Sequence, residues 1–272
     1  MVHRLYTPPA PLRRLVKCFW YWEGAPKTHA KEQLMPNGEA AIIINLRDEP
    51  IRIYDPGDLS RSESFGLAVL SGPHSRPFVI DSEQEERVFG IEFQPGGSFP
   101  FFRLPASEFS DSDVGLESLW RGTADEIRER LLMAPDLDSM FAVAETFLLR
   151  RAVRPLELHP GVSFALHRFC ARPQSTSVAS VLDRLGLSHR RFAELFHGQV
   201  GLTPKSFSRV QRFQRVLRLV HRAPEIDWAD VALDCGYYDQ PHFIHDFQAF
   251  SGFTPTIYAA RATEHLNHVP LV

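Results

Sequence analysis

The stretch ALDCGYYDQPHFIHDFQAFSGFTP, residues 232–255, decides the fold of the C-terminal part of this chain. An earlier stretch, VLDRLGLSHRRFAELFHGQVGLTP at residues 181–204, carries the same pattern. The two share apolar residues at helical spacing, a glycine, two phenylalanines and a closing Gly-x-Thr-Pro, and this many matches indicate a duplication. The matched positions are Val178, Val181, Leu182, Leu185, Gly186, Phe192, Phe196 and 201–204 against Trp228, Val231, Ala232, Cys235, Gly236, Phe243, Phe247 and 252–255.

Each repeat predicts a helix, a tight turn and a second helix. Apolar residues at i, i+3, i+4 and i+7 give the first helix one buried stripe. Gly186 and Gly236 follow directly, and glycine readily adopts the left-handed conformation that ends a helix. Ser188 and Asp239 are N-cap candidates for the second helix, and the closing Thr-Pro pairs cap and begin a further one. The chain therefore contains two predicted helix-turn-helix motifs, at about 177–200 and 227–251.

A long helix is predicted between the motifs, over residues 203–222. At about 1.5 Å per residue it would be roughly 30 Å long. A rigid spacer of that length would separate two recognition helices by nearly one DNA turn, roughly 34 Å, so both could enter successive major grooves. Its apolar stripe is Phe207, Val210, Phe213, Leu217 and Val220, and its other faces carry Lys205, Arg209, Arg212, Arg215, Arg218 and Arg222.

The net charge of −3, from 30 Lys and Arg against 33 Asp and Glu, argues against a protein that coats nucleic acid by bulk electrostatics. The charge is distributed unevenly, however. Residues 177–222 hold nine basic and two acidic side chains, whereas 223–260 hold no Lys or Arg and six acidic side chains. The first block favours contact with DNA phosphates, and the second predicts weak counterion release.

These residues resemble the AraC/XylS family of bacterial transcription regulators. The resemblance covers roughly 159–260, and 232–247 with 252–255 are its most specific part. It implies a DNA-binding region with two helix-turn-helix motifs joined by a long helix. The N-terminal half resembles the cupin-like sensor domains of that family at 20–23, 36–38 and 93–97.

The resemblance implies a set of DNA contacts in the first motif. Arg190 and Arg191 could reach guanine, and Glu194 could accept a hydrogen bond from cytosine. Helix N-termini and basic side chains commonly meet phosphates. The alternative is that these arginines only solvate a helix face. The candidates are Ser188, His189, Arg190, Arg191, Glu194, His197, Lys205 and Arg209.

The second motif departs from the family pattern. Family members commonly place Arg where His245 stands and Lys or Arg where Gln248 stands. The glutamines here can still bond bases, adenine in particular. We predict that the first motif supplies most of the affinity and the second tunes specificity. The candidates are Asp239, Gln240, His242, His245 and Gln248.

The N-terminal half reads as short strands after a helical start. Leu12, Leu15, Val16 and Phe19 fall at helical spacing. Strands separated by Gly and Pro turns suggest a β-sandwich or small barrel. The expected strands are 39–46, 51–54, 65–71, 76–80 and 87–94, and the helices are 123–133, opened by a Thr123–Glu126 capping box, and 137–151.

The predicted fold class is therefore a two-domain α+β protein, a cupin-like β-barrel or sandwich with flanking helices followed by an all-α double helix-turn-helix. Residues 1–154 form the effector-binding or dimerisation domain, β-rich to about 104 and helical over 105–154, and 159–262 form the DNA-binding domain. The helices of 123–152 either cover the sheet or supply a dimer surface. We favour dimer contact, because their apolar residues occupy more than one face.

A small-molecule effector is expected in the N-terminal domain, although its identity does not follow from the residues. Polar and aromatic side chains in or beside the strands could orient a ligand inside a barrel. The alternatives are a solid aromatic core and polar strand positions exposed to solvent. The pocket candidates are Trp20, Trp22, His74, Arg76, Glu92 and Gln94.

Signals for other chemistry are missing from the sequence. It has no GxSxG, P-loop, GxGxxG or HExxH motif, so we predict no enzyme, no catalytic residue and no cofactor. Cys235, His242 and His245 could be drawn as a metal cluster, but Cys235 belongs to a buried helical stripe, and we predict no metal. No apolar stretch is long enough to cross a bilayer, and the scattered cysteines suit a reduced cytosol.

The leading prediction is a cytoplasmic, sequence-specific and effector-responsive transcription regulator. Its expected partners are double-stranded promoter DNA, RNA polymerase, an unknown small-molecule effector and a second copy of the chain. The competing prediction is an enzyme or small-molecule carrier built on the β-domain, with a helical interaction module that binds DNA weakly or not at all. A steep fall of DNA affinity with salt would separate the two.

Overall fold

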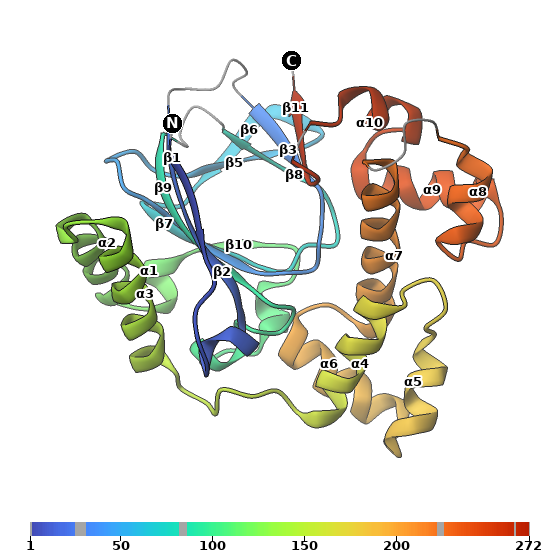
Figure 1. The fold of residues 1–272 in the computed structure, drawn as a ribbon, viewed down its shortest axis with the longest axis horizontal. Coiled ribbons are helices and arrows are strands. Elements are labelled where there is room, and N and C mark those ends of the chain that lie inside the picture. Colours follow the sequence, from blue (N-terminus) through green and yellow to red (C-terminus); the bar gives the residue numbers. More distant parts are fainter. Residues whose placement is uncertain (1, 25–30, 82–85, 222–225, 264, 272) are drawn as a thin grey trace.

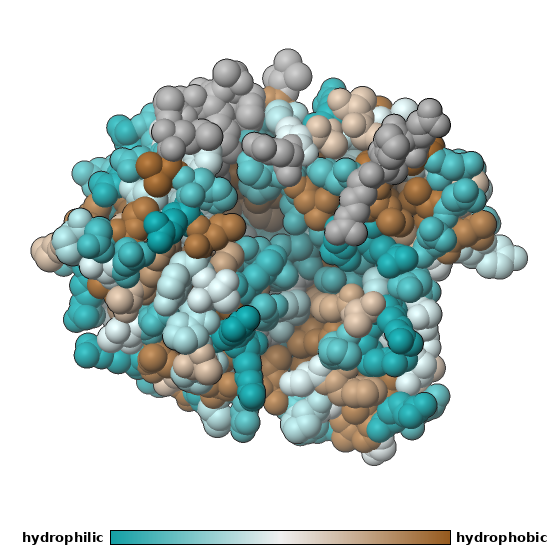
Figure 2. Space-filling view, viewed as in Figure 1, coloured by the Kyte–Doolittle hydropathy of each residue, from teal (hydrophilic) through white to brown (hydrophobic). Residues whose placement is uncertain are grey.

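The computed structural model describes residues 2–24, 31–81, 86–221, 226–263 and 265–271. The chain forms a β-rich half followed by a helical half, which lie side by side in Figure 1. On the face drawn in Figure 2, hydrophobic and hydrophilic residues are interspersed over both halves. Among the described helices, none combines the length and apolar character that a membrane span needs.

The larger sheet has six antiparallel strands and runs through the middle of the β-rich half. Side chains alternate along a strand, so β2 sends Phe19 and Tyr21 into a buried core and turns Trp20 and Trp22 to the other face. The strand order is β1 (Val2–Tyr6), β2 (Val16–Glu23), β9 (Arg87–Phe93), β4 (Ala41–Asn45), β7 (Ala68–Ser71) and β10 (Asp113–Gly115).

The smaller sheet has five antiparallel strands and takes its edge strand from the C-terminal end of the chain. The sequence predicted β-sheets in this half, and that is confirmed, but the sequence did not predict that residues beyond 262 would join them. That this half has a cupin-like fold remains a prediction. The order is β11 (His268–Leu271), β3 (Lys31–Leu34), β8 (Phe78–Asp81), β5 (Arg52–Asp55) and β6 (Asp58–Ser64).

Helices cover the outer face of the six-stranded sheet. α2 (Thr123–Met133) and α3 (Leu137–Arg151) have the predicted bounds, and α1 (Leu116–Leu119) precedes them. Phe141 of α3 stacks on Tyr6 of β1, with ring centroids 4.9 Å apart, and Trp120 and Phe147 extend the same core. The apolar residues of these helices therefore cover the sheet, and dimer contact by their remaining surface stays a prediction.

Two local predictions in this half are wrong. The helical spacing at residues 12–20 yields only one 3-10 turn, η1 (Leu12–Arg14), before β2 begins. A register shift between Val16 and Cys18 lets apolar residues at irregular spacing all face the core. The Thr123–Glu126 capping box does not form, because Gly122 takes the N-cap position of α2 and the Thr123 hydroxyl donates to the Arg121 carbonyl instead.

The helical half contains both predicted helix-turn-helix motifs, at opposite ends of α7 (Figure 1). Gly186 and Gly236 have left-handed φ angles of 63° and 75°. Ser188 accepts a hydrogen bond from the Arg191 backbone, and Asp239 accepts one from the His242 backbone, as predicted. The helices are α4 (Pro160–Ala171), α5 (Val178–Leu185), α6 (His189–Val200), α7 (Pro204–Val220), α8 (Trp228–Asp234), α9 (Gln240–Ser251) and α10 (Pro255–Arg261).

The central helix α7 is shorter than predicted. Its 17 residues correspond to about 26 Å, and Arg222 lies outside the described residues. Its apolar stripe is buried, and so are Gln211 and Gln214, because α7 also packs against the β-rich half. Two buried clusters form, one from residues 12–148 and one from Met35 with 162–269. The domain boundary near 154–159 stays a prediction.

Candidate nucleic-acid interface and effector cavity

The first recognition helix, α6, presents a basic N-terminal turn to solvent. The side chain of Arg190 is 91% exposed and donates to Glu194 at 2.9 Å. His189 and Arg191 are also exposed. An exposed i, i+4 ion pair contributes little stability, so Arg190 can exchange Glu194 for a base or phosphate at small cost. The predicted contacts of this turn are therefore accessible together.

The other first-motif candidates are less uniform. Lys205 is exposed on the first turn of α7, where Thr203 caps the helix by accepting from the Ser206 backbone. His197 is half-buried near the end of α6. The Ser188 hydroxyl is occupied as the N-cap acceptor. Lys205 thus stays available for a phosphate, whereas the role of Ser188 is to order the recognition helix.

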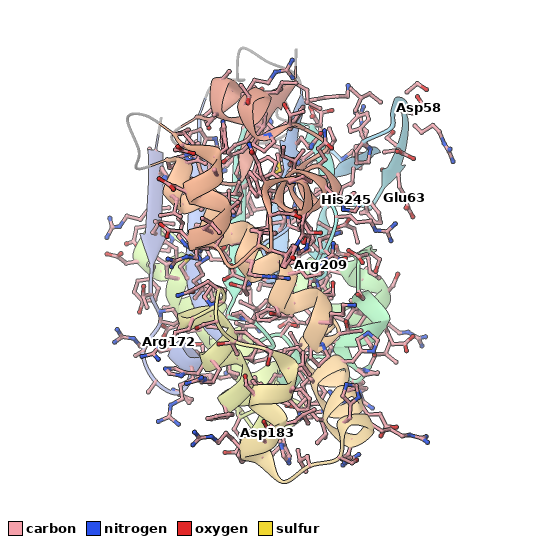
Figure 3. The ribbon with its side chains drawn as sticks, turned by 90° about the vertical axis from the view of Figure 1, so that its right-hand side faces the viewer. Asp58, Glu63, Arg172, Asp183, Arg209 and His245 are labelled. Atoms are coloured by element: carbon pink, nitrogen blue, oxygen red, sulfur yellow. The ribbon has the colours of Figure 1, made fainter. Side chains whose placement is uncertain are left out.

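Arg209 is half-buried and is paired within the fold. Its guanidinium donates to both carboxylate oxygens of Asp246, at 2.7 and 3.3 Å, and lies 5.2 Å from the centre of the Phe250 ring. The Asp246 side chain is only 4% exposed. Figure 3 shows Arg209 in the middle of this side of the molecule, with His245 of α9 above it. This contact ties α7 to the second recognition helix, α9. The phosphate contact that the sequence predicted for Arg209 stays a prediction.

Two further basic residues of α7 also bond to the second motif. Arg212 donates to the Gly236 carbonyl at 3.3 Å and lies over the Tyr237 ring, and Arg215 donates to the Asp234 carbonyl at 3.2 Å. The last carbonyls of a helix lack partners within it, and cations there are favourable. The arginines of α7 therefore cap the end of α8 and brace its turn.

The second recognition helix, α9, exposes neutral polar side chains. The His245 side chain is 82% exposed and that of His242 is 41% exposed. Gln240 and Gln248 are exposed as well, and Asp239 serves as the N-cap. The surface is less acidic than the sequence count implies, because Asp246 is buried against Arg209. Glu225, another of the six acidic residues, lies outside the described residues.

A cavity of about 420 Å³ lies between the two sheets of the β-rich half. Trp20, Trp22, His74 and Glu92 line it, as predicted for an effector pocket. A Cβ on Gly90 would lie 1.9 Å from the Trp20 ring, so only glycine lets the indole lie against β9. The inner face of the six-stranded sheet thus borders a cavity, while its outer face packs against the helices that cover it.

Two pocket candidates lie elsewhere. The Arg76 side chain is 75% exposed and faces Asp111 at 4.0 Å. The Gln94 backbone donates to the Leu15 carbonyl, and its own carbonyl accepts from Gly97. Neither is among the residues that line the cavity. Gln94 follows the end of β9 and Arg76 precedes the start of β8, so neither is held in a strand at the cavity wall.

One end of the cavity holds two glutamates that share a lysine. Lys17 Nζ lies 2.8 Å from Glu39 and 3.0 Å from Glu92, and the Cys18 thiol lies 3.4 Å from Glu92. Asn37 donates to Glu39 at 3.2 Å. Of these residues only Glu92 could be predicted from the sequence, because Glu39 and Lys17 come from other segments and form no motif with it.

The shared lysine leaves the two carboxyl groups unequal. Burial, reinforced by the charge of Glu92, raises the pKa of Glu39 to about 7, although Lys17 opposes the rise. Burial also acts to raise the pKa of Glu92, but Lys17 outweighs it and the pKa is lowered. Burial beside Glu92 raises the pKa of the Cys18 thiol to about 12. The pair therefore holds one firmly ionised carboxylate and one that titrates near neutral pH.

A third carboxylate stands behind His74. His74 Nε2 is 3.4 Å from Asp113 and 3.3 Å from the Ser71 hydroxyl, and its ring packs on Phe78 at 4.3 Å. Both His74 and Asp113 are more than nine-tenths buried as side chains. This arrangement fixes the orientation of an imidazole at the cavity wall.

The C-terminal segment closes the cavity and connects it to α7. His265, Asn267 and His268 line it, and His268 lies 2.8 Å from the buried Glu32. Gln214 of α7 donates to Asn267 at 2.9 Å and to the backbone carbonyl of residue 36 at 2.8 Å. Its neighbour on the same face, Gln211, donates to the backbone carbonyl of residue 37 at 2.9 Å. One cavity wall is therefore held by the helix that joins the two motifs.

Within the described residues, no group of three or more His, Cys, Asp and Glu side chains is placed to hold an ion. Cys235 is fully buried, as its place in the helical stripe predicted, and burial raises the pKa of its thiol to about 11. His242 lies against the Tyr237 ring.

Two helix-turn-helix motifs on one buried helix, attached to a hollow β-domain, define a two-domain DNA-binding regulator. Residues 181–261 match the family model described as a helix-turn-helix domain. Residues 4–115 match the model of a domain of unknown function (DUF6597). The C-terminal part of the chain is an AraC-type helix-turn-helix domain, and the chain is a DNA-binding transcription regulator.

Several solved structures are similar to this chain. ToxT from Vibrio cholerae with a bound unsaturated fatty acid is 12% identical, with 91% of this chain and 96% of that chain covered and a TM-score of 0.45. An AraC-type regulator from Chromobacterium violaceum is 22% identical, covering 39% and 94%, with a TM-score of 0.35. The DNA-binding domain of AdpA in complex with a target DNA is 22% identical, covering 37% of this chain and 90% of that chain, with a TM-score of 0.34. No curated protein matches the chain.

Proposed function

We propose that this protein is an effector-responsive transcription regulator that grips promoter DNA chiefly through its first helix-turn-helix motif. The observation that carries the proposal is the basic turn at the start of α6, where Arg190 and Arg191 are exposed while Arg209, Arg212 and Arg215 are engaged within the fold. Exposed arginines at a helix N-terminus suit both guanine edges and phosphates. The second motif then contributes base contacts from Gln240, His242, His245 and Gln248.

The two recognition helices enter successive major grooves in this proposal. They lie at opposite ends of α7 (Figure 1), whose length of about 26 Å is somewhat less than one DNA turn, about 34 Å. Flanking turns at both ends add to the separation. Since α7 is braced by the arginine contacts to α8 and α9, the spacing between the two helices would be rigid.

Effector binding would act on this rigid unit through the cavity wall. The backbone at residues 36 and 37 faces the cavity on one side and accepts hydrogen bonds from Gln214 and Gln211 on the other. Asn267 has the same double role. A ligand with different affinities for two placements of this wall shifts the placement of α7, which is the requirement for allosteric control.

Several finer features belong to the proposal as well. The protein acts in the cytoplasm, uses its surface outside the two motifs to contact RNA polymerase, and binds as a homodimer without catalysing a reaction. The cavity also suits the competing function, a small-molecule carrier with a helical interaction module. A carrier would bind its ligand equally well with the α6 arginines removed and would show no specific DNA binding.

The test is a selection of bound fragments from genomic DNA, followed by salt titration on a selected site. Log affinity should fall steeply with log salt, by about 0.9 per phosphate engaged. Replacing Arg191 with Ala should reduce affinity and flatten the slope, whereas Arg13→Ala, an exposed arginine in the β-rich half, should leave both unchanged. Absence of any selected sequence, or an unchanged slope in Arg191→Ala, would contradict the proposal.

A further inference from the structure

We propose that the cavity takes an apolar or aromatic molecule bearing a protonated amine, with the amine between Glu39 and Glu92 and the apolar part against Trp20 and Trp22. The inference deepens the proposed function, since it rests on this cavity being the effector site. Nothing in the sequence motifs assigns a ligand class here. The assignment comes from the charges and surfaces that the fold brings together at the cavity wall.

The charge at the polar end is unbalanced toward the negative. Glu39 and Glu92 both line this end and share one permanent cation, Lys17, while Asp113 lies behind the wall and faces the imidazole of His74. Lys17 is shared by two of these carboxylates at 2.8 and 3.0 Å. Buried carboxylates without a full partner are costly, and a ligand ammonium between Glu39 and Glu92 supplies the missing positive charge.

The position of Lys17 leaves room for that ammonium. Its side chain is 44% exposed, while those of Glu39 and Glu92 are 16% and 27% exposed. Both glutamates line the cavity and Lys17 does not, so the lysine pairs with them from outside. Their cavity side remains open to a ligand. Burial raises the pKa of Glu39 to about 7, against the opposing charge of Lys17, and the neighbouring charge of Glu92 adds to the rise.

The walls beside this end are apolar and aromatic. Trp20 and Trp22 extend along β2, and Ile43, Val69 and Val88 lie on neighbouring strands. Trp faces attract cations as well as apolar groups. A volume of about 420 Å³ lies within the range of small-molecule sites, roughly 300–1,000 Å³. An aromatic or branched apolar amine therefore fits both the walls and the charge.

An anionic ligand fits this arrangement poorly. A carboxylate at the polar end would meet Glu39 and Glu92 and compete for the only permanent cation described there. At the far end of β8, Asp81 and Arg52 contribute one charge of each sign beside Tyr54, which donates to Asp81 at 3.1 Å. Lys31, whose ammonium lies 4.3 Å over the Tyr54 ring, pairs in register with Asp81 and adds a second cation near that end, but Lys31 is not among the residues that line the cavity.

The test compares three probes with one apolar part, namely 3-phenylpropylamine, 3-phenylpropan-1-ol and 3-phenylpropanoate. Calorimetry and thermal shift on the full chain at pH 8 should rank them amine, alcohol, acid, with the amine ahead of the alcohol by about tenfold for one buried charge pair. An acid that binds as tightly as the amine, or failure of all three at millimolar concentration, would overturn the inference.

Two variants locate the amine. Glu39→Gln and Glu92→Gln should each reduce the preference for amine over alcohol by about tenfold while leaving the alcohol unchanged. Either variant suffices if the other fails to fold. The matched control is Glu63→Gln on the exposed strand β6, which should preserve the preference. A preference retained in both cavity variants would overturn the inference.

Failure of this inference is distinguishable from failure of the proposed function. The same protein samples are titrated with a selected DNA site, with and without each probe. If the acid binds most tightly and specific DNA binding is intact, only the inferred ligand class is contradicted. If the amine binds most tightly and specific DNA binding is absent, the ligand class is supported and the proposed function is contradicted.

Discussion

The two helix-turn-helix motifs share a pattern but use charge in opposite ways. In the first, Arg190 and Arg191 extend from the start of α6 into solvent. In the second, the nearby arginines belong to α7, are half-buried, and donate to Asp246 and to the carbonyls that end α8. The basic segment 177–222 therefore contains arginines that are exposed to solvent on α6 and arginines of α7 that stabilise the second motif. A charge count over a segment does not measure the charge that a ligand meets.

The turns of the motifs differ as well. A Cβ on Gly186 would meet nothing within 4 Å, whereas a Cβ on Gly236 would lie 2.3 Å from the Gln174 carbonyl. The second turn is packed against the loop that precedes the first motif. The first turn faces open space, so the second motif is the more embedded of the two, and its substitutions should affect stability more than DNA contact.

The largest effect is expected from breaking the Arg209–Asp246 contact. Arg209→Ala removes the only guanidinium that donates to the buried Asp246 carboxylate in the described contacts and leaves it only the longer contacts to His242 and His245, at 3.8 and 3.9 Å. We expect a loss of about 3 kcal/mol in the free energy of unfolding. Urea unfolding measures it. The control Arg190→Ala, at a 91% exposed site, should change stability by less than about 0.5 kcal/mol. Equal losses at the two sites would remove the distinction between brace and surface.

The turn glycines give the next largest effect. Gly186→Ala should cost about 1 kcal/mol, because an L residue is strained at its φ of 63°. Gly236→Ala adds a clash with the Gln174 backbone and should cost about 2–3 kcal/mol. Thermal melts of the two variants compare them directly. Matching losses would mean that the second turn is not packed as described.

DNA affinity should separate the motifs in the reverse direction. Arg190→Ala or Arg191→Ala should weaken binding to a selected site by roughly 1–3 kcal/mol. Gln240→Ala, at the start of α9, should cost less than about 1 kcal/mol, since a neutral side chain releases no counterion. A gel-shift titration ranks them. The opposite ranking would refute the assignment of most affinity to the first motif.

The smallest effect concerns a buried carboxyl that shares its partner, in contrast to Asp246. The pKa of Glu39, about 7, lies above its ordinary 4.5, so the folded state binds more protons between these values. The stabilisation is complete below pH 4.5 and is lost as the pH rises through 7. The groups around the Glu39 carboxyl are Lys17 and Cys18 from β2, Glu92 from β9, the neighbouring Asn37, and Cys170 from α4.

We expect wild-type stability to fall by about 1 kcal/mol from pH 5 to pH 8 relative to Glu39→Gln, because one pKa unit equals about 1.4 kcal/mol and Lys17 and Glu92 absorb part of the shift. Urea titrations at both pH values measure the difference. Parallel pH profiles for the two proteins would show that Glu39 does not titrate in this range.

Much of the helical half could be predicted because its signals are local. Glycine conformation, N-caps and apolar spacing act within a few residues, and Gly186, Ser188 and Asp239 behave as predicted. Predictions failed where a local signal had two solutions. The apolar residues at 12–20 form a 3-10 turn at Leu12–Arg14 and then the strand β2 from Val16, where a register shift lets both Val16 and Phe19 face the core. Gly122 displaces Thr123 as the cap of α2.

The candidate sites were only partly predictable. Trp20, Trp22, His74 and Glu92 were named from residue type near strands. Arg76 and Gln94 were named in the same way, but they lie just outside β8 and β9 and do not line the cavity. Lys17 and Glu39 were missed, since they meet Glu92 only through pairing of β2, β4 and β9. The residues of 265–268 were missed for the same reason, because β11 joins β3 across the length of the chain.

The sequence by itself determined the two helix-turn-helix motifs, the helix between them and the exposed basic turn of α6, because caps, turns and periodicity depend on neighbours along the chain. Only the tertiary structure decided that Arg209, Arg212 and Arg215 of α7 brace the second motif. It also decided that the β-rich half is hollow, that two glutamates share one lysine there, and that the C-terminal strand closes the cavity. Those outcomes depend on which distant surfaces pack together, and burial then sets the charge and reach of each side chain.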